Sequence, residues 1–301
     1  MKRKIVRHGS ATLSVSLPLK WAKHHNLDKG EEVEVDEQPH ALIIKPCADK
    51  QPERKQFNID GLKRVGTAYL TSSYREGFDE IEFFYDDPAI MKWLQEFVSQ
   101  QIVGFEIVKQ SSTYCLVKDM SGVMEESFDV ALRRLWLLVL SMAEDCHNAI
   151  TKKDKEQAKS IEYRDQSVNK FANYCCRLLL KKGHCTYKKT PIYFHTILNL
   201  EHLADEYKNL AKFYFEFPQK LDKPLLKSFE DINKNLNQLY RLFYKFDPKQ
   251  AEQLFKDTKA NFPKLNKTII SGKNSSLFAS YLFSISKRIR KLISSTIEIK
   301  V

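Results

Sequence analysis

From about residue 125 to the end of the chain, apolar residues recur every three or four positions, which is the spacing of amphipathic helices. Leu132, Leu135, Trp136 and Val139 begin this pattern, and Pro or Gly residues separate the later segments. We expect six helices, which start near residue 125 and then cover about residues 154–181, 191–217, 224–246, 248–270 and 275–299. Helices of this length predict two tandem three-helix bundles, over residues 125–217 and 218–301. Pro263, inside the fifth helix, is expected to kink or split it.

The first 47 residues follow a different pattern. Polar and apolar side chains alternate over residues 12–17 and 31–36, as they do in half-buried strands, and a short helix is expected to begin at Pro18. Residues 1–47 therefore predict a small β-rich domain. A domain of this size buries too little apolar surface to be stable alone, and this one has no disulfide or metal motif, so we expect it to dimerise.

A polar stretch over residues 47–57 predicts a linker, and residues 58–121 then mix both periodicities. Strand-like segments are expected over residues 65–71, 80–85, 105–109 and 114–118, and a helix over residues 88–101. Residues 58–121 therefore predict a small α/β domain between the β-rich domain and the helices.

Composition narrows the class of protein. Of 301 residues, 43% are apolar, which is enough for real cores. No apolar run approaches the roughly 20 residues of a membrane-spanning helix, and the N-terminus does not have the pattern of a signal peptide. The six cysteines show no CxxC spacing, so we expect reduced thiols and a cytoplasmic protein.

Charge points to a polyanionic partner. Residues 1–30 contain 7 basic residues and 1 acidic residue, whereas residues 31–37 contain 5 acidic residues and no basic one. Lys and Arg neutralise phosphates, and Arg also reads guanine edges. The alternative is a solvated charged face. The candidate DNA-binding residues are Lys2, Arg3, Lys4, Arg7, Thr12 and Lys20.

The same segment carries a family resemblance. Residues 3–18, with their basic strand and a Ser-Leu-Pro before the short helix, and Leu27-x-x-Gly30-Glu31-x-Val33 resemble an AbrB/SpoVT swapped-hairpin domain. The resemblance implies an intertwined homodimer that binds DNA through its basic face.

Acidic side chains gather on two neighbouring helices. Two antiparallel helices would let their oxygens converge on one divalent or iron-type metal ion. The alternative is a set of salt bridges to Arg164, Lys170 or Lys208. The candidate metal ligands are Glu162, Asp165, Asn169, Glu201 and Asp205.

Residues 161–171 and 200–207 resemble the two metal-binding motifs of PhoU domains, which lie on the second and third helices of three-helix bundles. The resemblance implies negative regulation of phosphate uptake through contacts with the phosphate transporter and its signalling partners, and a capacity to hold iron, zinc or similar ions. Asn169 replaces an expected acidic residue, and residues 284–291 (SISKRIRK) show no second motif.

Taken together, the order of domains resembles archaeal phosphate uptake regulators of PhoU type. We predict a dimeric DNA-binding transcriptional regulator of phosphate uptake that is not an enzyme, with the bundles as a sensor or partner-binding module. The alternative is a signalling adaptor that binds a phosphate transporter or kinase, with the N-terminal domain as a dimeriser only. Residues 218–301, with 17 basic and 7 acidic residues, would contact DNA, an acidic protein or lipid headgroups, or simply be solvated.

Overall fold

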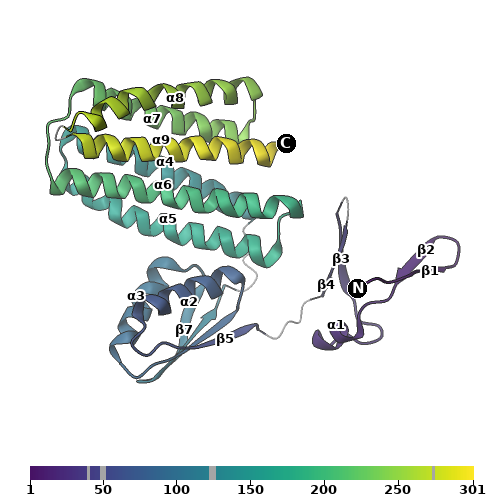
Figure 1. Cartoon of the computed structure of the whole chain (residues 1–301). Coiled ribbons are helices and arrows are strands. Elements are labelled where there is room, and N and C mark those ends of the chain that lie inside the picture. The colour runs from purple at the N-terminus through teal and green to yellow at the C-terminus, as the bar shows by residue number, and fades with distance from the viewer. Residues whose placement is uncertain (39–40, 48–51, 122–126, 273–274) are drawn as a thin grey trace. The chain divides into compact units, whose positions relative to one another are not determined.

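The computed structural model describes residues 1–38, 41–47, 52–121, 127–272 and 275–301 (Figure 1). The chain divides into two compact units, Met1–Glu53 and Arg54–Val301, and each is described here by itself. Of the predicted linker over residues 47–57, residues 48–51 lie outside the described ranges, and its last part, Arg54–Asn58, is a strand of the second unit.

The first unit consists of two separate hairpins and one short helix. Strands β1 (Ile5–His8) and β2 (Thr12–Val15) form one hairpin, β3 (Val33–Gln38) and β4 (Ala41–Pro46) form the other, and α1 (Leu19–His24) lies between them in sequence. This confirms the expected small β-rich region. None of residues 1–37 and 41–47 is buried. Large apolar side chains are exposed at Ile5, Val6, Leu13, Val15, Leu19, Val35 and Leu42.

The second unit begins with a four-stranded sheet of order β5-β6-β8-β7, in which β5 and β6 are parallel and the other pairs antiparallel. Alternate strand residues such as Ile81, Phe83 and Val117 enter a core with Leu70 and Leu94 of the two helices. The elements are β5 (Arg54–Asn58), α2 (Lys63–Glu76), β6 (Glu80–Phe84), α3 (Ala89–Gln101), β7 (Phe105–Gln110) and β8 (Tyr114–Asp119).

Two expectations for this region were wrong. Residues 65–71 were predicted to be a strand but belong to α2, whose buried Leu70 and Tyr74 lie one helical turn apart. A short apolar run cannot by itself distinguish the two periods. The strand β5 was missed because its residues are mostly polar and exposed, as at the edge of a sheet.

Six long helices follow, and the six predicted spans are confirmed. Asp154, Asp222 and Asp247 cap the N-termini of three of them by accepting backbone N–H bonds. Pro263 does not split its helix, since α8 runs through it. The helices are α4 (Phe128–Lys152), α5 (Lys155–Lys182), α6 (Thr190–Glu216), α7 (Lys223–Tyr244), α8 (Pro248–Ile270) and α9 (Ser276–Lys300).

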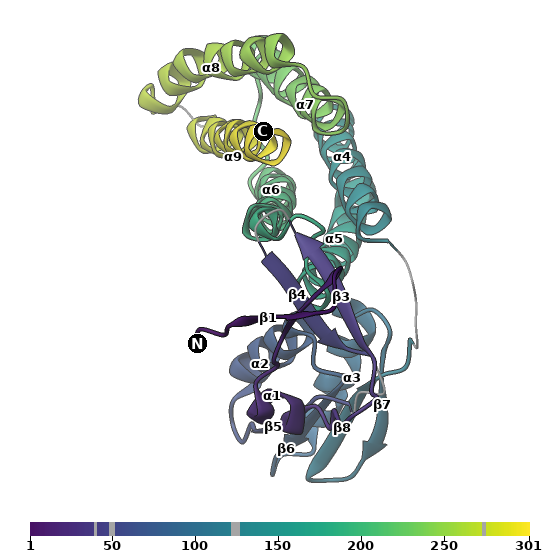
Figure 2. The same cartoon turned by 90° about the vertical axis from the view of Figure 1, so that its right-hand side faces the viewer.

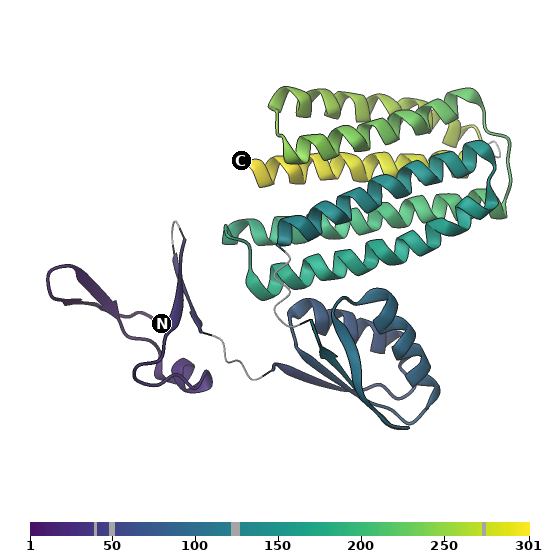
Figure 3. The same cartoon turned by 180° about the vertical axis from the view of Figure 1, so that it is seen from behind.

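The helices share one hydrophobic core, which extends from Leu132 and Trp136 of α4 to Leu282 and Ile289 of α9. Figure 2, which looks nearly along the helices, shows α5, α4, α7 and α8 following one another in an arc, with α6 and α9 on its inner side. From behind, α5 lies between the other helices and the α/β domain (Figure 3). Helix α5 therefore contacts both parts of the second unit. Within the described ranges, no helix is long and apolar enough to cross a bilayer.

Candidate functional site

The predicted acidic residues lie along the seam between α5 and α6. The buried residues Ile161, Val168 and Cys175 form the apolar stripe of α5, and Asp165 falls on the same stripe. Packing of this stripe therefore carries the Asp165 carboxylate into the seam, where only 5% of the residue is exposed. A buried carboxylate requires a partner, because its desolvation is costly.

That partner is a lysine of α6. The Lys208 ammonium lies 2.7 Å from Asp165 Oδ2 and 2.6 Å from Asp205 Oδ1, so one cation bridges a carboxylate from each helix. On α5, Asn169 donates a 3.4 Å hydrogen bond to the same Asp165 oxygen. This is the salt-bridge alternative to a metal site. Of the other two cations considered, Arg164 pairs with Asp145 and Lys170 donates to the Ser99 carbonyl.

Burial and charge together set the electrostatics of the seam. Burial raises the pKa of Asp165 above its ordinary value, although Lys208 donates to the carboxylate. Burial alone would lower the pKa of Lys208, but hydrogen bonds to Asp165 and Asp205 raise it, so Lys208 is an ammonium at neutral pH. Glu201 lies close to the same group, and its pKa is raised by burial and then by repulsion from Asp205. The seam thus contains two carboxylates bridged by Lys208, with Glu201 close to both of them.

The donor set does not fit a metal ion as it is arranged. Asp165 Oδ1 and Asn169 Oδ1 are buried and lack a hydrogen-bond partner, so two oxygen acceptors are available. However, the Lys208 ammonium occupies the space between Asp165 and Asp205, and among the described residues no three His, Cys, Asp or Glu side chains converge on a common point. A metal at this seam stays a prediction, and it requires Lys208 to move.

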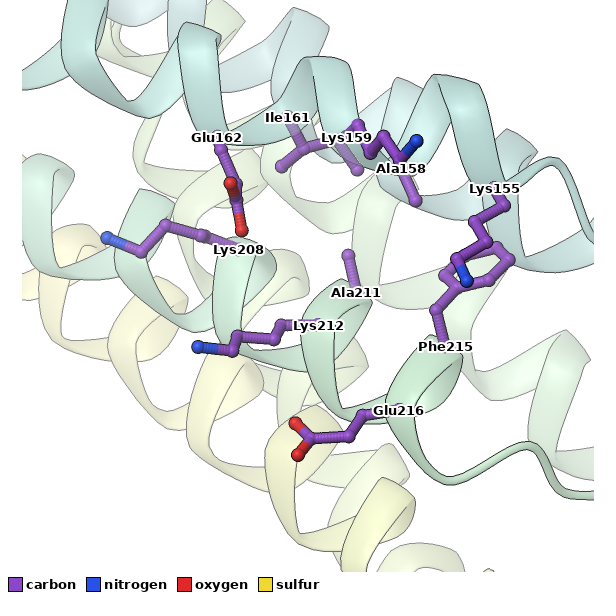
Figure 4. Close-up of a pocket in the computed structure, with 10 residues that line it drawn as sticks. All are labelled: Lys155, Ala158, Lys159, Ile161, Glu162, Lys208, Ala211, Lys212, Phe215 and Glu216. Carbon is purple, nitrogen blue, oxygen red and sulfur yellow. The ribbon is translucent and has the colours of Figure 1, made fainter.

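Glu162, the remaining candidate ligand, lies apart from this group. It is exposed and lines a hollow of about 260 Å³ between the first half of α5 and the second half of α6 (Figure 4). Ala158 and Ala211 contribute to its apolar wall, and Lys155 and Lys212 contribute charge at its edge. The structure therefore brings Asp165, Asn169, Glu201 and Asp205 together and leaves Glu162 beside them.

Sequence reasoning missed Arg177, the buried residue that docks the α/β domain on α5. Its guanidinium donates to the carbonyl oxygens of Tyr74 and Phe78, at 2.9 and 2.8 Å, and to Asp119 Oδ2 at 2.8 Å. It also lies 4.8 Å from the centroid of the Phe105 ring, a cation–π distance. Although burial opposes it, hydrogen bonds from Ser121 and Arg177 lower the pKa of Asp119. Asn173, Arg177 and Lys181 lie on one face of α5, and in the sequence this polar face has the pattern of a solvated one.

Further polar contacts extend this docking surface along α5. Arg75 of α2 donates a 2.8 Å bond to Asn173 Oδ1, and Asn173 in turn donates to the Gln101 carbonyl at 3.1 Å. Lys181 forms an ion pair with Asp79. Helix α5 therefore has the acid–lysine seam on one side and the α/β domain on another.

The predicted DNA-binding residues are all exposed in the first unit. Lys2, Arg3 and Lys4 precede β1, and Lys20 lies in α1. The β1–β2 register pairs Arg7 with Leu13 and His8 with Thr12. Because successive residues of a strand face opposite sides, Arg7 shares a face with the exposed Ile5, Leu13 and Val15, and Thr12 lies on the other face.

Part of the basic cluster of α9, which consists of Lys287, Arg288, Arg290 and Lys291, is used in packing. Arg288 pairs with Glu206 of α6 at 3.0 Å, and Ser284 donates to the same carboxylate. Arg290 donates to the Phe255 carbonyl of α8 at 2.8 Å. These contacts join α9 to its neighbours, so this part of the positive charge is not a free docking surface.

Comparison with known proteins finds similarity in the helical region. Residues 132–213, which include α5, most of α4 and most of α6, match the family model described as PhoU domain. The crystal structure of the phosphate transport system regulatory protein PhoU from Streptococcus pneumoniae is similar in fold, with a TM-score of 0.51 and 18% sequence identity. The match covers 58% of this chain and 93% of that one. A search of curated proteins found no match.

Proposed function

We propose that the chain is a regulatory adaptor of phosphate transport, not an enzyme, and that its helical region binds a phosphate transporter or an associated signalling protein. The observation that carries this proposal is the PhoU-domain match over residues 132–213. The match supports the adaptor interpretation more than the DNA-binding regulator that the sequence first suggested. The fold similarity to a phosphate transport regulatory protein agrees with it.

Helix α5 gives the adaptor a way to transmit a signal. Lys208 joins α5 to α6 through Asp165, and Arg177 joins α5 to the α/β domain. A shift of α5 would therefore change both contacts. A partner or ligand drives such a shift only if it binds the two arrangements with different affinity.

Hydrogen exchange of the full chain, with and without the purified phosphate transporter of the same organism, tests the adaptor. We expect slower amide exchange in α4, α5 or α6 when the transporter is present, and no change with empty detergent micelles. Slower exchange confined to residues 1–47, or none at a transporter concentration well above that of the chain, would contradict the proposal.

A second function, DNA binding, is favoured by the first unit itself. None of residues 1–37 and 41–47 is buried, and eight large apolar side chains, including Met1, are exposed, so the unit needs a partner surface to cover them. A second copy of the chain would supply such a surface. Pairing of two copies would also double the positive charge of residues 1–30.

Binding to DNA from the upstream region of its own gene and from phosphate-transporter promoters tests this second function. The affinity is expected to fall steeply as salt rises, and a Lys2→Ala/Arg3→Ala/Lys4→Ala variant should show a shallower slope. A variant that removes the same charge from α8, Lys249→Ala/Lys264→Ala/Lys267→Ala, is the matched control. Equal loss in both variants would indicate nonspecific attraction, and no binding would leave the first unit as a dimeriser.

A further inference from the structure

We propose that a hollow at one end of the helical region binds a nucleotide with two or more phosphates. The turn between α4 and α5, the last turn of α6 and the start of α7 surround it, and its volume is about 780 Å³. That volume lies in the range of small-molecule sites, roughly 300–1,000 Å³. It shares Lys155 and Phe215 with the smaller hollow of Figure 4, so the two hollows are neighbours. This ligand goes beyond the adaptor function and does not depend on it.

Charge in this hollow is of one sign. Lys153, Lys155 and Lys220 line it, and no carboxylate does. Asp154 and Glu156 flank Lys155 in sequence, and Asp222 follows Leu221. Their carboxylates are engaged elsewhere, because Asp154 caps α5, Glu156 pairs with Lys159 and Asp222 caps α7. None of the three lysines forms an ion pair with a described residue. By contrast, the hollow of Figure 4 has Glu162 and Glu216 in its wall. Three uncompensated ammonium groups fit a polyphosphate.

An unsatisfied amide adds a second, independent feature. Gln219 lines the same hollow, and both its Oε1 and its Nε2 are buried without a hydrogen-bond partner among the described residues. A buried polar group without a partner is costly, so a ligand that pairs with it gains affinity. A glutamine amide donates and accepts side by side, and this pattern matches the edge of an adenine base.

The remaining wall is apolar and aromatic. Ile150, Leu221 and Leu226 contribute aliphatic surface, and Tyr214 and Phe215 contribute rings. Aromatic side chains stack on bases of any sequence. Free phosphate or pyrophosphate would use the lysines, but it offers no base to accept and donate at the Gln219 amide together and no ring to stack on this wall. A nucleotide uses all three features.

Isothermal titration of the full chain with ATP, and separately with pyrophosphate, tests the proposal. We expect saturable ATP binding at one site per chain, at least about tenfold tighter than pyrophosphate. Gln219→Met should weaken ATP about tenfold and leave pyrophosphate unchanged. Lys155→Ala/Lys220→Ala should weaken both. Lys188→Ala/Lys249→Ala, at the opposite end of the helices, removes the same charge and should weaken neither.

The melting temperature of the free protein separates a binding role from a structural one. Because the Gln219 amide is unsatisfied, Gln219→Met should melt at the same or a higher temperature than the wild type while it loses ATP affinity. Absence of saturable ATP binding would overturn the proposal. So would equal affinities for ATP and pyrophosphate that Gln219→Met does not change, or equal losses in the two lysine variants.

Discussion

Replacement of Lys208 by methionine tests the seam between α5 and α6 directly. The substitution keeps an unbranched apolar chain but removes the ammonium group between Asp165 and Asp205. Asp165 would then be a buried carboxylate without a counterion, and removal of one partner of a buried ion pair costs about 3–5 kcal/mol. The Lys208 side chain is 27% exposed and that of Asp205 is 36% exposed, so solvent moderates the loss. We expect a destabilisation of about 3 kcal/mol.

Urea unfolding of the full chain, followed by circular dichroism at 222 nm, measures this loss in the helices. Unfolding of a chain with two units need not be two-state, so we would compare the transition of the helical region between variants. Lys208→Met/Asp165→Asn is the decisive companion, because it removes the isolated charge together with its partner. It should recover more than half of the stability that Lys208→Met loses.

Two results would refute this reasoning. A loss below about 1 kcal/mol for Lys208→Met would mean that the ammonium contributes no more than a surface ion pair. A double variant as unstable as Lys208→Met would show that the stem of the lysine matters and its charge does not.

The other predictions concern docking, pH and metal. Arg177→Met should cost about 3–5 kcal/mol and speed amide exchange in α2 and β8, with α7 unchanged as an internal control. Because the pKa of Asp119 is lowered in the folded protein, its ionised form stabilises the fold above the ordinary pKa near 3.8, and this stabilisation is lost as the pH falls below that value. Amide exchange in α2 should therefore rise below about pH 3.8, and it should rise less in Asp119→Asn. Because the pKa of Glu201 is raised, its ionisation opposes folding above about pH 4.5, so Glu201→Gln should be more stable than wild type at pH 7 and equal to it at pH 4, as thermal melts would show. Mn²⁺ should leave the melting temperature of the wild type unchanged and raise that of Lys208→Ala; a rise in the wild type alone would restore the metal interpretation.

Periodicity sufficed for the helices because each is long and has a continuous apolar stripe. Helix α8 shows the limit of a local rule, since Pro263 was expected to kink or split the helix and does not split it. The α/β domain was harder. The apolar pattern over residues 65–71 is too short to distinguish a helix from a strand. Strand β5 is polar because it lies at the edge of the sheet, where most of its residues are exposed to solvent. Whether these two segments form a strand or a helix depends on tertiary contacts, which a local sequence pattern does not show.

The sequence predicted that the acidic residues lie between α5 and α6, but it did not predict which side chains pair with them. Asp165 of α5 and Asp205 of α6 lie on either side of one seam, but which cation neutralises them depends on side-chain reach. Lys208 lies three residues after Asp205 on α6 and reaches across to Asp165. The role of Arg177 arises from the docking of the α/β domain on α5. The hollow beside Gln219 arises from the packing of the helix ends around it. Contacts between segments that are far apart in sequence produce no regular residue spacing, so a sequence pattern cannot predict them.

The most direct test of the central claim is the affinity of the full chain for the phosphate transporter of the same organism in lipid nanodiscs, with empty nanodiscs as the blank. The adaptor account predicts saturable binding that Lys2→Ala/Arg3→Ala/Lys4→Ala leaves unchanged. Binding no stronger than to empty nanodiscs, together with specific DNA binding that the same variant abolishes, would contradict the account and establish the DNA-binding regulator instead.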